Sequence, residues 1–328
     1  MTTRRELLLG FGASALTWPL ATRGQQAVKV PHVGYLSTGS ARSNAAFINA
    51  LRDGLRELGY VDGRNIVIDL RWVGDSPADF PAAASSLVEA KASAIVGTCI
   101  PSTRAAKAAT QTIPIVMSVD GDPVAADLIT SFARPGGNVT GTTTLFEALI
   151  PKWIELIRVA APGIQILALL RDPYNVVDPF YAAQFDEAAK RLGVGVEQFE
   201  VRAPDDVDRA FARMGQRKLG GLVVLTEAFL AGEIDHIVPL ANRYALPSIY
   251  GFREFAEAGG LMSYGLSFRD YYRRVARYLD LVLKGTKPAD LPVEQPTRIE
   301  LVINLATARK LGIRLPPELI VRADRVIE

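Results

Sequence analysis

The chain has 328 residues, of which 49% are hydrophobic and 22% are charged, so an intrinsically disordered or collagen-like protein is excluded. This length is sufficient for two domains with separate hydrophobic cores. The formal net charge is only +2, which is not the basic footprint of a nucleic-acid-binding protein.

The N-terminal segment has the features of an export signal. Arg4 and Arg5 precede an apolar run over residues 7–20, and this run is shorter than the ~20 residues that a membrane-spanning helix needs. We therefore expect residues 1–24 to be a signal peptide that is cleaved near Gly24/Gln25. The mature protein would then lie in a bacterial periplasm, and the arginine pair leaves both the general and the twin-arginine export routes open.

Short apolar runs then alternate with amphipathic segments, which is the pattern of βαβ units with parallel strands. The alternation predicts strands at 30–36, 66–73, 94–98 and 113–118, and helices at 44–58, 77–89 and 102–110.

The stretch from Ile113 to Thr143 organises the first half of the chain. It combines the fourth strand, the acidic turn Asp120-Gly121-Asp122-Pro123, a short helix, a glycine-rich loop and a strand at 139–143.

The alternation restarts at Lys152. Helices are predicted at 152–160, 181–192, 207–214, 234–244 and 271–285, and strands at 166–170, 194–201, 221–225, 247–251 and 261–266. A second set of βα units therefore follows the first.

Two sets of βα units without a long linker predict an α/β protein with two Rossmann-like lobes, each with a parallel sheet, joined by a multi-strand hinge. The chain is expected to cross between the lobes near 142–147, to return near 250–264 and to cross again near 292–299. Lobe 1 would comprise residues 28–143 and about 250–291, and lobe 2 residues 144–249 and about 292–328. The binding site would lie in the cleft between the lobes.

Open α/β sheets bind ligands at the carboxyl ends of their strands. Ten polar or aromatic residues that follow or close predicted strands are therefore the expected ligand contacts: Ser37, Thr38, Thr98, Ser118, Asp120, Asn175, Thr226, Glu227, Tyr250 and Tyr264. Tyr250 and Tyr264 are included because their strands bracket the predicted return to lobe 1, and packing under the hinge is the alternative for both.

The acidic turn allows two interpretations. Asp120 either contacts a ligand or holds backbone amides of a neighbouring turn, whereas Asp122, directly before Pro123, favours the capping of a helix. An exported enzyme that uses Asp120 and Glu227 as acid and base is a further alternative.

Motifs for nucleotide, serine-hydrolase and zinc chemistry are absent from the sequence, and it contains only His32, His236 and the single cysteine Cys99. We therefore expect no enzymatic activity, no cofactor and no metal site. A single cysteine also excludes an intramolecular disulfide.

Several strings along the whole chain resemble one protein family. They are the arginine pair with its apolar run, Val33–Ser37, Ile113–Val116, Gly121–Val124, Ala133–Gly141 (ARPGGNVTG) and Leu291–Pro296 (LPVEQP). In these strings the chain resembles the exported substrate-binding proteins of ATP-driven ABC uptake transporters, in the branch that includes tryptophan-binding-type proteins.

This resemblance implies a type I periplasmic binding protein fold that clasps a small molecule, such as an amino acid or an aromatic or organic acid, by hinge closure. We expect a monomeric periplasmic solute-binding protein whose partners are that ligand and a membrane permease, with no nucleic acid. A ligand sensor that docks on a receptor is the alternative.

Overall fold

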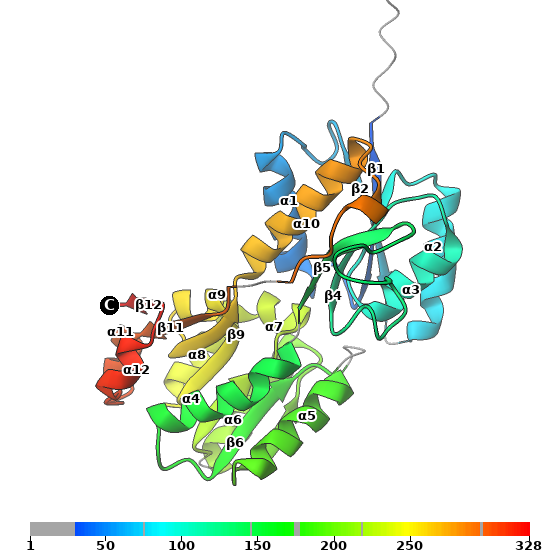
Figure 1. Ribbon diagram of the computed structural model, residues 1–328. Helices are drawn as coiled ribbons and strands as arrows, with labels where there is room; N and C mark the ends of the chain where they lie inside the picture. The colour runs from blue at the N-terminus through cyan, green and yellow to red at the C-terminus, as the bar shows by residue number, and fades with distance from the viewer. Residues whose placement is uncertain (1–29, 75, 145, 174–177, 218, 296–297) are drawn as a thin grey trace, which may run out of the picture.

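The computed structural model describes residues 30–328 except 75, 145, 174–177, 218 and 296–297. The predicted signal peptide and Asn175 lie outside the described residues. The chain forms two α/β lobes that lie one above the other in Figure 1. Within the described part of the chain, no helix has both the length and the apolar character needed to cross a bilayer.

The first lobe is built on a parallel five-stranded sheet with the order β2-β1-β3-β4-β5. Its strands are β1 (His32–Thr38), β2 (Val67–Val73), β3 (Ala94–Gly97), β4 (Ile115–Asp120) and β5 (Val139–Thr144). The helical elements of its first half are α1 (Ala45–Glu57), η1 (Pro77–Asp79), α2 (Phe80–Glu89) and α3 (Ile100–Ala109).

Alternate residues of β1 enter two different cores, because successive side chains of a strand point to opposite faces of the sheet. Val33 and Tyr35 join the core that contains α1 and the distant helix α10 (Phe268–Leu283), and Leu36 joins the core that contains α2 and α3. Figure 1 shows α10, in orange, alongside the blue α1.

The second lobe is built on a seven-stranded sheet with the order β12-β11-β10-β9-β8-β6-β7. Its strands are β6 (Ile166–Arg171), β7 (Gly195–Glu200), β8 (Gly221–Val224), β9 (Ser248–Phe252), β10 (Met262–Leu266), β11 (Glu300–Asn304) and β12 (Arg325–Ile327). Only the β10–β11 pair is antiparallel among the described pairs.

The remaining helices, apart from one turn, pack around this second sheet. They are η2 (Phe146–Leu149), α4 (Ile150–Ala160), α5 (Asp178–Arg191), α6 (Pro204–Arg217), α7 (Ala228–Gly232), α8 (Ile234–Arg243), α9 (Arg253–Glu257), α11 (Leu305–Lys310) and α12 (Pro317–Val321). The turn η3 (Pro288–Asp290) contacts β5 of the first lobe.

The return of the chain to the first lobe differs from the prediction. β9 and β10 were expected near that return, with residues from about 250 in lobe 1, but both strands pair within the seven-stranded sheet. The chain returns only after Leu266, where α10 begins and packs on α1. An apolar run identifies a buried strand, whereas its pairing partners decide to which sheet the strand belongs.

The final crossing lies within the predicted range of 292–299, but after Glu294, so the lobe boundary at about 292 was placed slightly too early. Glu294 pairs with β5, since Glu294 N donates to Gly141 O at 3.0 Å and Thr143 N donates to Glu294 O at 3.0 Å. The LPVEQP string therefore begins on the first lobe. It lies beside the ARPGGNVTG string, because Thr140 Oγ1 donates to Leu291 O at 2.8 Å.

The short helix expected after Pro123 is absent, and the chain forms turns there instead. Asp122 Oδ1 accepts hydrogen bonds from the amides of Val124 at 2.8 Å and Ala125 at 3.2 Å, so it stabilises this turn in place of the helix that it was predicted to cap. Asp127 then adopts a left-handed backbone conformation with φ of 57°, which ends the helical turn.

Gly141 is the residue of the ARPGGNVTG string that tolerates a side chain least. Its φ is 130°, and a Cβ atom would lie 2.2 Å from Met117 O on the neighbouring strand. We expect Gly141→Ala to lower the free energy of unfolding by at least ~3 kcal/mol, measured by urea denaturation, because it combines backbone strain with a clash against backbone atoms.

Gly137→Ala is the matched control, because Gly137 has a φ of 69° but open space around its Cα. Its cost should be only the ~1–2 kcal/mol of a left-handed backbone conformation. Equal losses for the two variants would contradict the interpretation.

Candidate functional site

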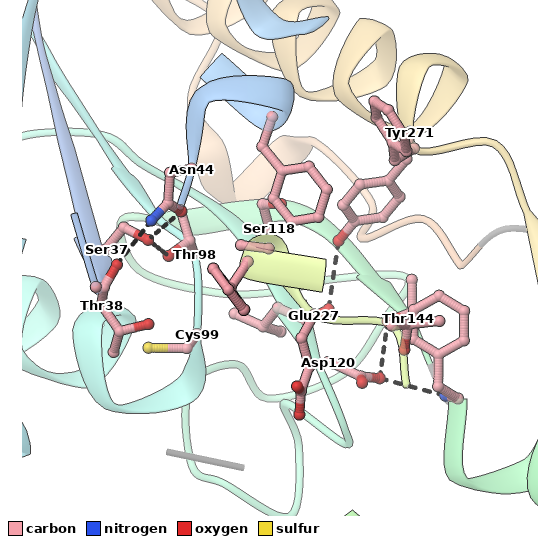
Figure 2. Close-up of a pocket in the computed structure, with 18 of the residues that line it drawn as sticks. Ser37, Thr38, Asn44, Thr98, Cys99, Ser118, Asp120, Thr144, Glu227 and Tyr271 are labelled. Carbon is pink, nitrogen blue, oxygen red and sulfur yellow. Dashed lines mark hydrogen bonds between the residues drawn. The ribbon is translucent and has the colours of Figure 1, made fainter. Parts of the chain in front are cut away.

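A cavity lies between the two lobes and encloses about 960 Å³ of empty space, including its open mouth. The first lobe contributes the carboxyl ends of β1, β3, β4 and β5 and the start of α1, and the second lobe contributes the segments after β6 and β8 and the ends of β9 and β10. Figure 2 shows many of the lining side chains.

The structure brings together seven of the residues selected from the sequence. They are Ser37, Thr38, Thr98, Ser118, Asp120, Thr226 and Glu227. They meet because the carboxyl ends of parallel strands in both sheets face the same cleft. Asn175 lies outside the described residues, whereas Tyr250 and Tyr264 do not line the cavity.

Tyr250 is a core residue of the second lobe. It has 0% exposed surface, its ring stacks on Phe255 at 4.5 Å between centroids, and burial raises the pKa of its hydroxyl. Tyr264 is half-buried, and its backbone oxygen accepts a hydrogen bond from Trp153 Nε1 at 2.6 Å. Tyr250 therefore packs inside the core, and Tyr264 packs against the same core.

The cavity is instead lined by the residues two positions beyond these tyrosines, Phe252 and Leu266, which are the last residues of β9 and β10. The sequence pattern ended the first of these strands one residue too early. The second strand was predicted to end at residue 266, as it does, so there the aromatic residue was selected in place of the last residue of the strand.

Eight aromatic side chains line the cavity among its described residues: Phe47, Phe146, Tyr181, Phe229, Phe252, Phe268, Tyr271 and Tyr272. They come from both lobes, and Phe47 of α1 contacts Phe252 of β9 edge-to-face at 5.9 Å between ring centroids. Phe47, Tyr271 and Tyr272 lie in the helices predicted at 44–58 and 271–285, and none of them was among the expected ligand contacts. Helical periodicity cannot distinguish a ring that fills a core from one that borders a cavity.

A polar network on the first lobe holds the loop between β1 and α1. Ser37 Oγ donates to Asn44 Oδ1 at 3.0 Å, and Thr98 Oγ1 donates to Ser37 Oγ at 2.8 Å. Asn44 Nδ2 donates to Thr38 O at 2.9 Å and to Ser40 O at 3.1 Å. Asn44, which the sequence analysis did not select, therefore joins the ends of β1 and β3 to the start of α1 (Figure 2).

Asp120 lies at the junction of the cavity and the hinge. Its Oδ1 accepts hydrogen bonds from Thr144 Oγ1 at 2.7 Å and from the Phe146 amide at 3.3 Å, where the chain first leaves the lobe (Figure 2). Burial, with a smaller contribution from Glu147, raises the pKa of Asp120 to about 7. The structural hydrogen bonds predicted for Asp120 are present, and the side chain also borders the cavity.

Glu227 contributes a second carboxylate from the opposite lobe. Glu227 has 2% exposed surface, and its Oε2 accepts a hydrogen bond from the Asp172 amide at 2.6 Å. Asp172 also lines the cavity, whereas lysine and arginine are absent from the described lining. The cavity therefore has acidic character on both lobes.

Cys99 lines the cavity beside Thr98, and its Sγ lies 3.3 Å from Ser102 Oγ. Burial raises the pKa of this thiol, so it is not activated as a thiolate. In the described part of the chain, no group of three or more His, Cys, Asp or Glu side chains is arranged to hold a metal ion.

Comparisons with known proteins agree with this architecture. Residues 38–327 match the profile of a family described as "ABC transporter substrate binding protein". The chain is 27% identical over 273 residues to the tyrosine-binding protein of Clostridioides difficile strain R20291, an alignment that covers 83% of this chain and 77% of the relative.

Two solved structures are similar over nearly their whole length. A conserved domain protein from Vibrio cholerae has a TM-score of 0.70 and 27% identity, with 91% of this chain and 100% of that chain covered. A domain from Streptococcus pneumoniae in complex with L-Trp has a TM-score of 0.67 and 25% identity, with 90% and 99% covered. The predicted two-lobed α/β fold of type I periplasmic binding proteins is confirmed.

The raised pKa of Asp120 makes a prediction about stability. The folded state retains the proton of this group up to about pH 7, whereas an unfolded aspartate loses it near its ordinary pKa of ~4. Ionised Asp120 therefore opposes folding at pH 8 but not at pH 4. We expect Asp120→Asn, which retains an acceptor for Thr144 and Phe146, to raise Tm relative to the wild type by ~2–4 °C more at pH 8 than at pH 4. A Tm difference that is independent of pH would contradict this account.

Proposed function

Because the chain belongs to the ABC transporter substrate-binding protein family, we propose that it is the periplasmic receptor of an ATP-driven uptake transporter and that it binds an aromatic amino acid between its lobes. The observation that carries this proposal is the combination of eight aromatic side chains with acidic groups in one interlobe cavity. The predicted signal peptide at 1–24 supports export, and we expect the mature protein to act as a monomer.

The aromatic lining supports an aromatic ligand. Phe47, Phe252 and Phe268 contact one another with ring centroids 5.6–5.9 Å apart, and they form an apolar wall to which both lobes contribute. A planar ligand ring that enters this wall is removed from water and gains edge-to-face or stacked contacts. Such a ligand would contact both lobes at once.

The carboxylates provide a partner for the amino group of the ligand. Asp120 borders the cavity from the first lobe and Glu227 from the second, so an ammonium group near both would connect the lobes. Ion pairs of this kind become strong when closure removes water from the cleft.

The ligands of similar proteins agree with this chemistry. One relative is a tyrosine-binding protein, and one similar solved structure contains L-Trp. Both ligands combine an aromatic ring with an ammonium group. These similarities support an aromatic amino acid for this chain rather than an aliphatic one.

Closure around the ligand would provide the signal that a permease recognises. The loop after β1 already reaches the second lobe, since the Arg42 guanidinium lies 3.7 Å from the Glu233 carboxylate. A ligand that contacts both lobes would stabilise a closed arrangement of the lobes. Docking on a sensor receptor is the alternative use of the same closed state, and it would be favoured if a tagged protein recovered a histidine kinase and no permease from membranes.

The role of Asp120 in ligand binding can be tested by calorimetry with L-tyrosine and L-tryptophan. We expect Asp120→Asn to weaken binding by ~30-fold or more at pH 8, because the ammonium group loses its charged partner. Asp122→Asn is the matched control, since it removes the same charge two residues away at an exposed position outside the cavity. Equal affinities for Asp120→Asn and the wild type would contradict the proposed site.

The affinity should also depend on pH. Asp120 is protonated below pH 7, so the wild-type affinity is expected to rise between pH 6 and pH 8 by up to ~10-fold, whereas Asp120→Asn should show a flatter profile. Titrations of both proteins in matched buffers measure this difference. The same slope in both proteins would show that another group is responsible.

A further inference from the structure

The hydrogen-bond donors of the cavity are largely used within the protein. On the first lobe, the Ser37 hydroxyl donates to Asn44 and the Thr98 hydroxyl donates to Ser37. The Asn44 amide donates to two backbone carbonyl oxygens, those of Thr38 and Ser40. These side chains therefore have few hydrogens left for a negatively charged ligand group.

The hydrogen-bond donors near the hinge are also used within the protein. Thr144 donates its hydroxyl hydrogen to Asp120, and the Tyr271 hydroxyl lies 3.3 Å from the backbone oxygens of both Val119 and Thr142. Pro101 lies in the first turn of α3, two residues after the lining residue Cys99. It has no backbone N–H and therefore cannot donate a hydrogen bond there.

Four hydroxyl groups of the described lining show no hydrogen bond within the described part of the chain, those of Thr38, Ser118, Tyr181 and Thr226. With backbone amides, they are the neutral donors that remain for a carboxylate. The same lining contains the carboxylates of Asp120, Asp172 and Glu227, and its described residues include no lysine or arginine. The cavity thus offers many acceptors with negative charge and few donors.

From this imbalance we infer that the cleft recognises its ligand through the ammonium group and the ring, and that it also binds aromatic monoamines, which are aromatic amino acids without their carboxylate. This inference rests on the proposed function and extends its ligand class. An ammonium group supplies three donors to an acceptor-rich site, whereas a carboxylate brings a like charge into it.

The aromatic wall favours the same ligand class. A cation near the faces of several aromatic rings is attracted by their quadrupoles, and this attraction increases when the site is dry. Removal of the carboxylate retains both favoured features, the cation and the ring. Acetylation of the nitrogen removes the cation and retains the ring and the carboxylate.

Calorimetry on the mature protein tests the inference with three probes: L-tyrosine, tyramine and N-acetyl-L-tyrosine. The tryptophan series of L-tryptophan, tryptamine and N-acetyl-L-tryptophan provides a second set. We expect the Kd of the amine to lie within ~10-fold of the Kd of its amino acid, and the N-acetyl compound to bind at least ~100-fold more weakly.

The outcomes separate the two proposals. Binding of the amino acid with a loss of ~100-fold or more for the amine would overturn the inference and leave the proposed function intact. Binding of the N-acetyl compound as tightly as the amino acid would also overturn it. If neither an amino acid nor an amine bound in either series, the proposed function itself would fail.

Substitutions at the carboxylates add a second measurement. Asp120→Asn and Glu227→Gln should weaken the binding of tyramine at least as much as the binding of L-tyrosine, since tyramine has no charged group other than its ammonium. Asp122→Asn, exposed and outside the cavity, is the control, and unfolding midpoints show that each variant is folded. Unchanged tyramine affinity in both carboxylate variants would contradict recognition of the ammonium group.

Discussion

The two lobes depend on a shared apolar contact where their strand ends meet. Phe47 of the first lobe packs against Phe252 of the second lobe and against Phe268, where the chain returns to the first lobe. Phe252 and Phe268 belong to one hydrophobic core that extends through both lobes, and Phe47 packs on it. Burial of these rings favours close approach of the lobes, because apolar surface leaves water. The strand ends are thereby held opposite one another, and the polar cavity forms between them.

Asp120 connects this cavity to the hinge. Its carboxylate accepts hydrogen bonds from Thr144 and Phe146, where the chain leaves the first sheet, and it borders the space in which a ligand would lie. A charge that approaches Asp120 therefore acts on the hinge segment as well as on the cleft. In contrast, the two strings that resemble the family most clearly fasten β5 to residues 291–294 and lie outside the cavity lining. They explain the fold and carry no information about the ligand.

Much of the candidate site could be predicted, because the carboxyl ends of parallel strands are readable in the sequence. Ser37, Thr98, Asp120 and Glu227 were found in this way. Tyr250 and Tyr264 failed as lining residues because β9 and β10 extend two residues beyond them, which places Phe252 and Leu266 at the cavity instead. Phe47 could not be found, since its helical spacing is the same for a core residue and for the wall of a cleft.

The sequence by itself determined the α/β class, the two sets of βα units and the chemistry at the strand ends, because periodicity and turn residues act over a few neighbouring positions. Only the tertiary structure decided that β9 and β10 belong to the larger sheet, that α10 returns to α1, and that aromatic rings from both lobes line one cavity. These features depend on pairing and packing between residues far apart in the chain. Local patterns contain no record of which distant partner buries a given surface.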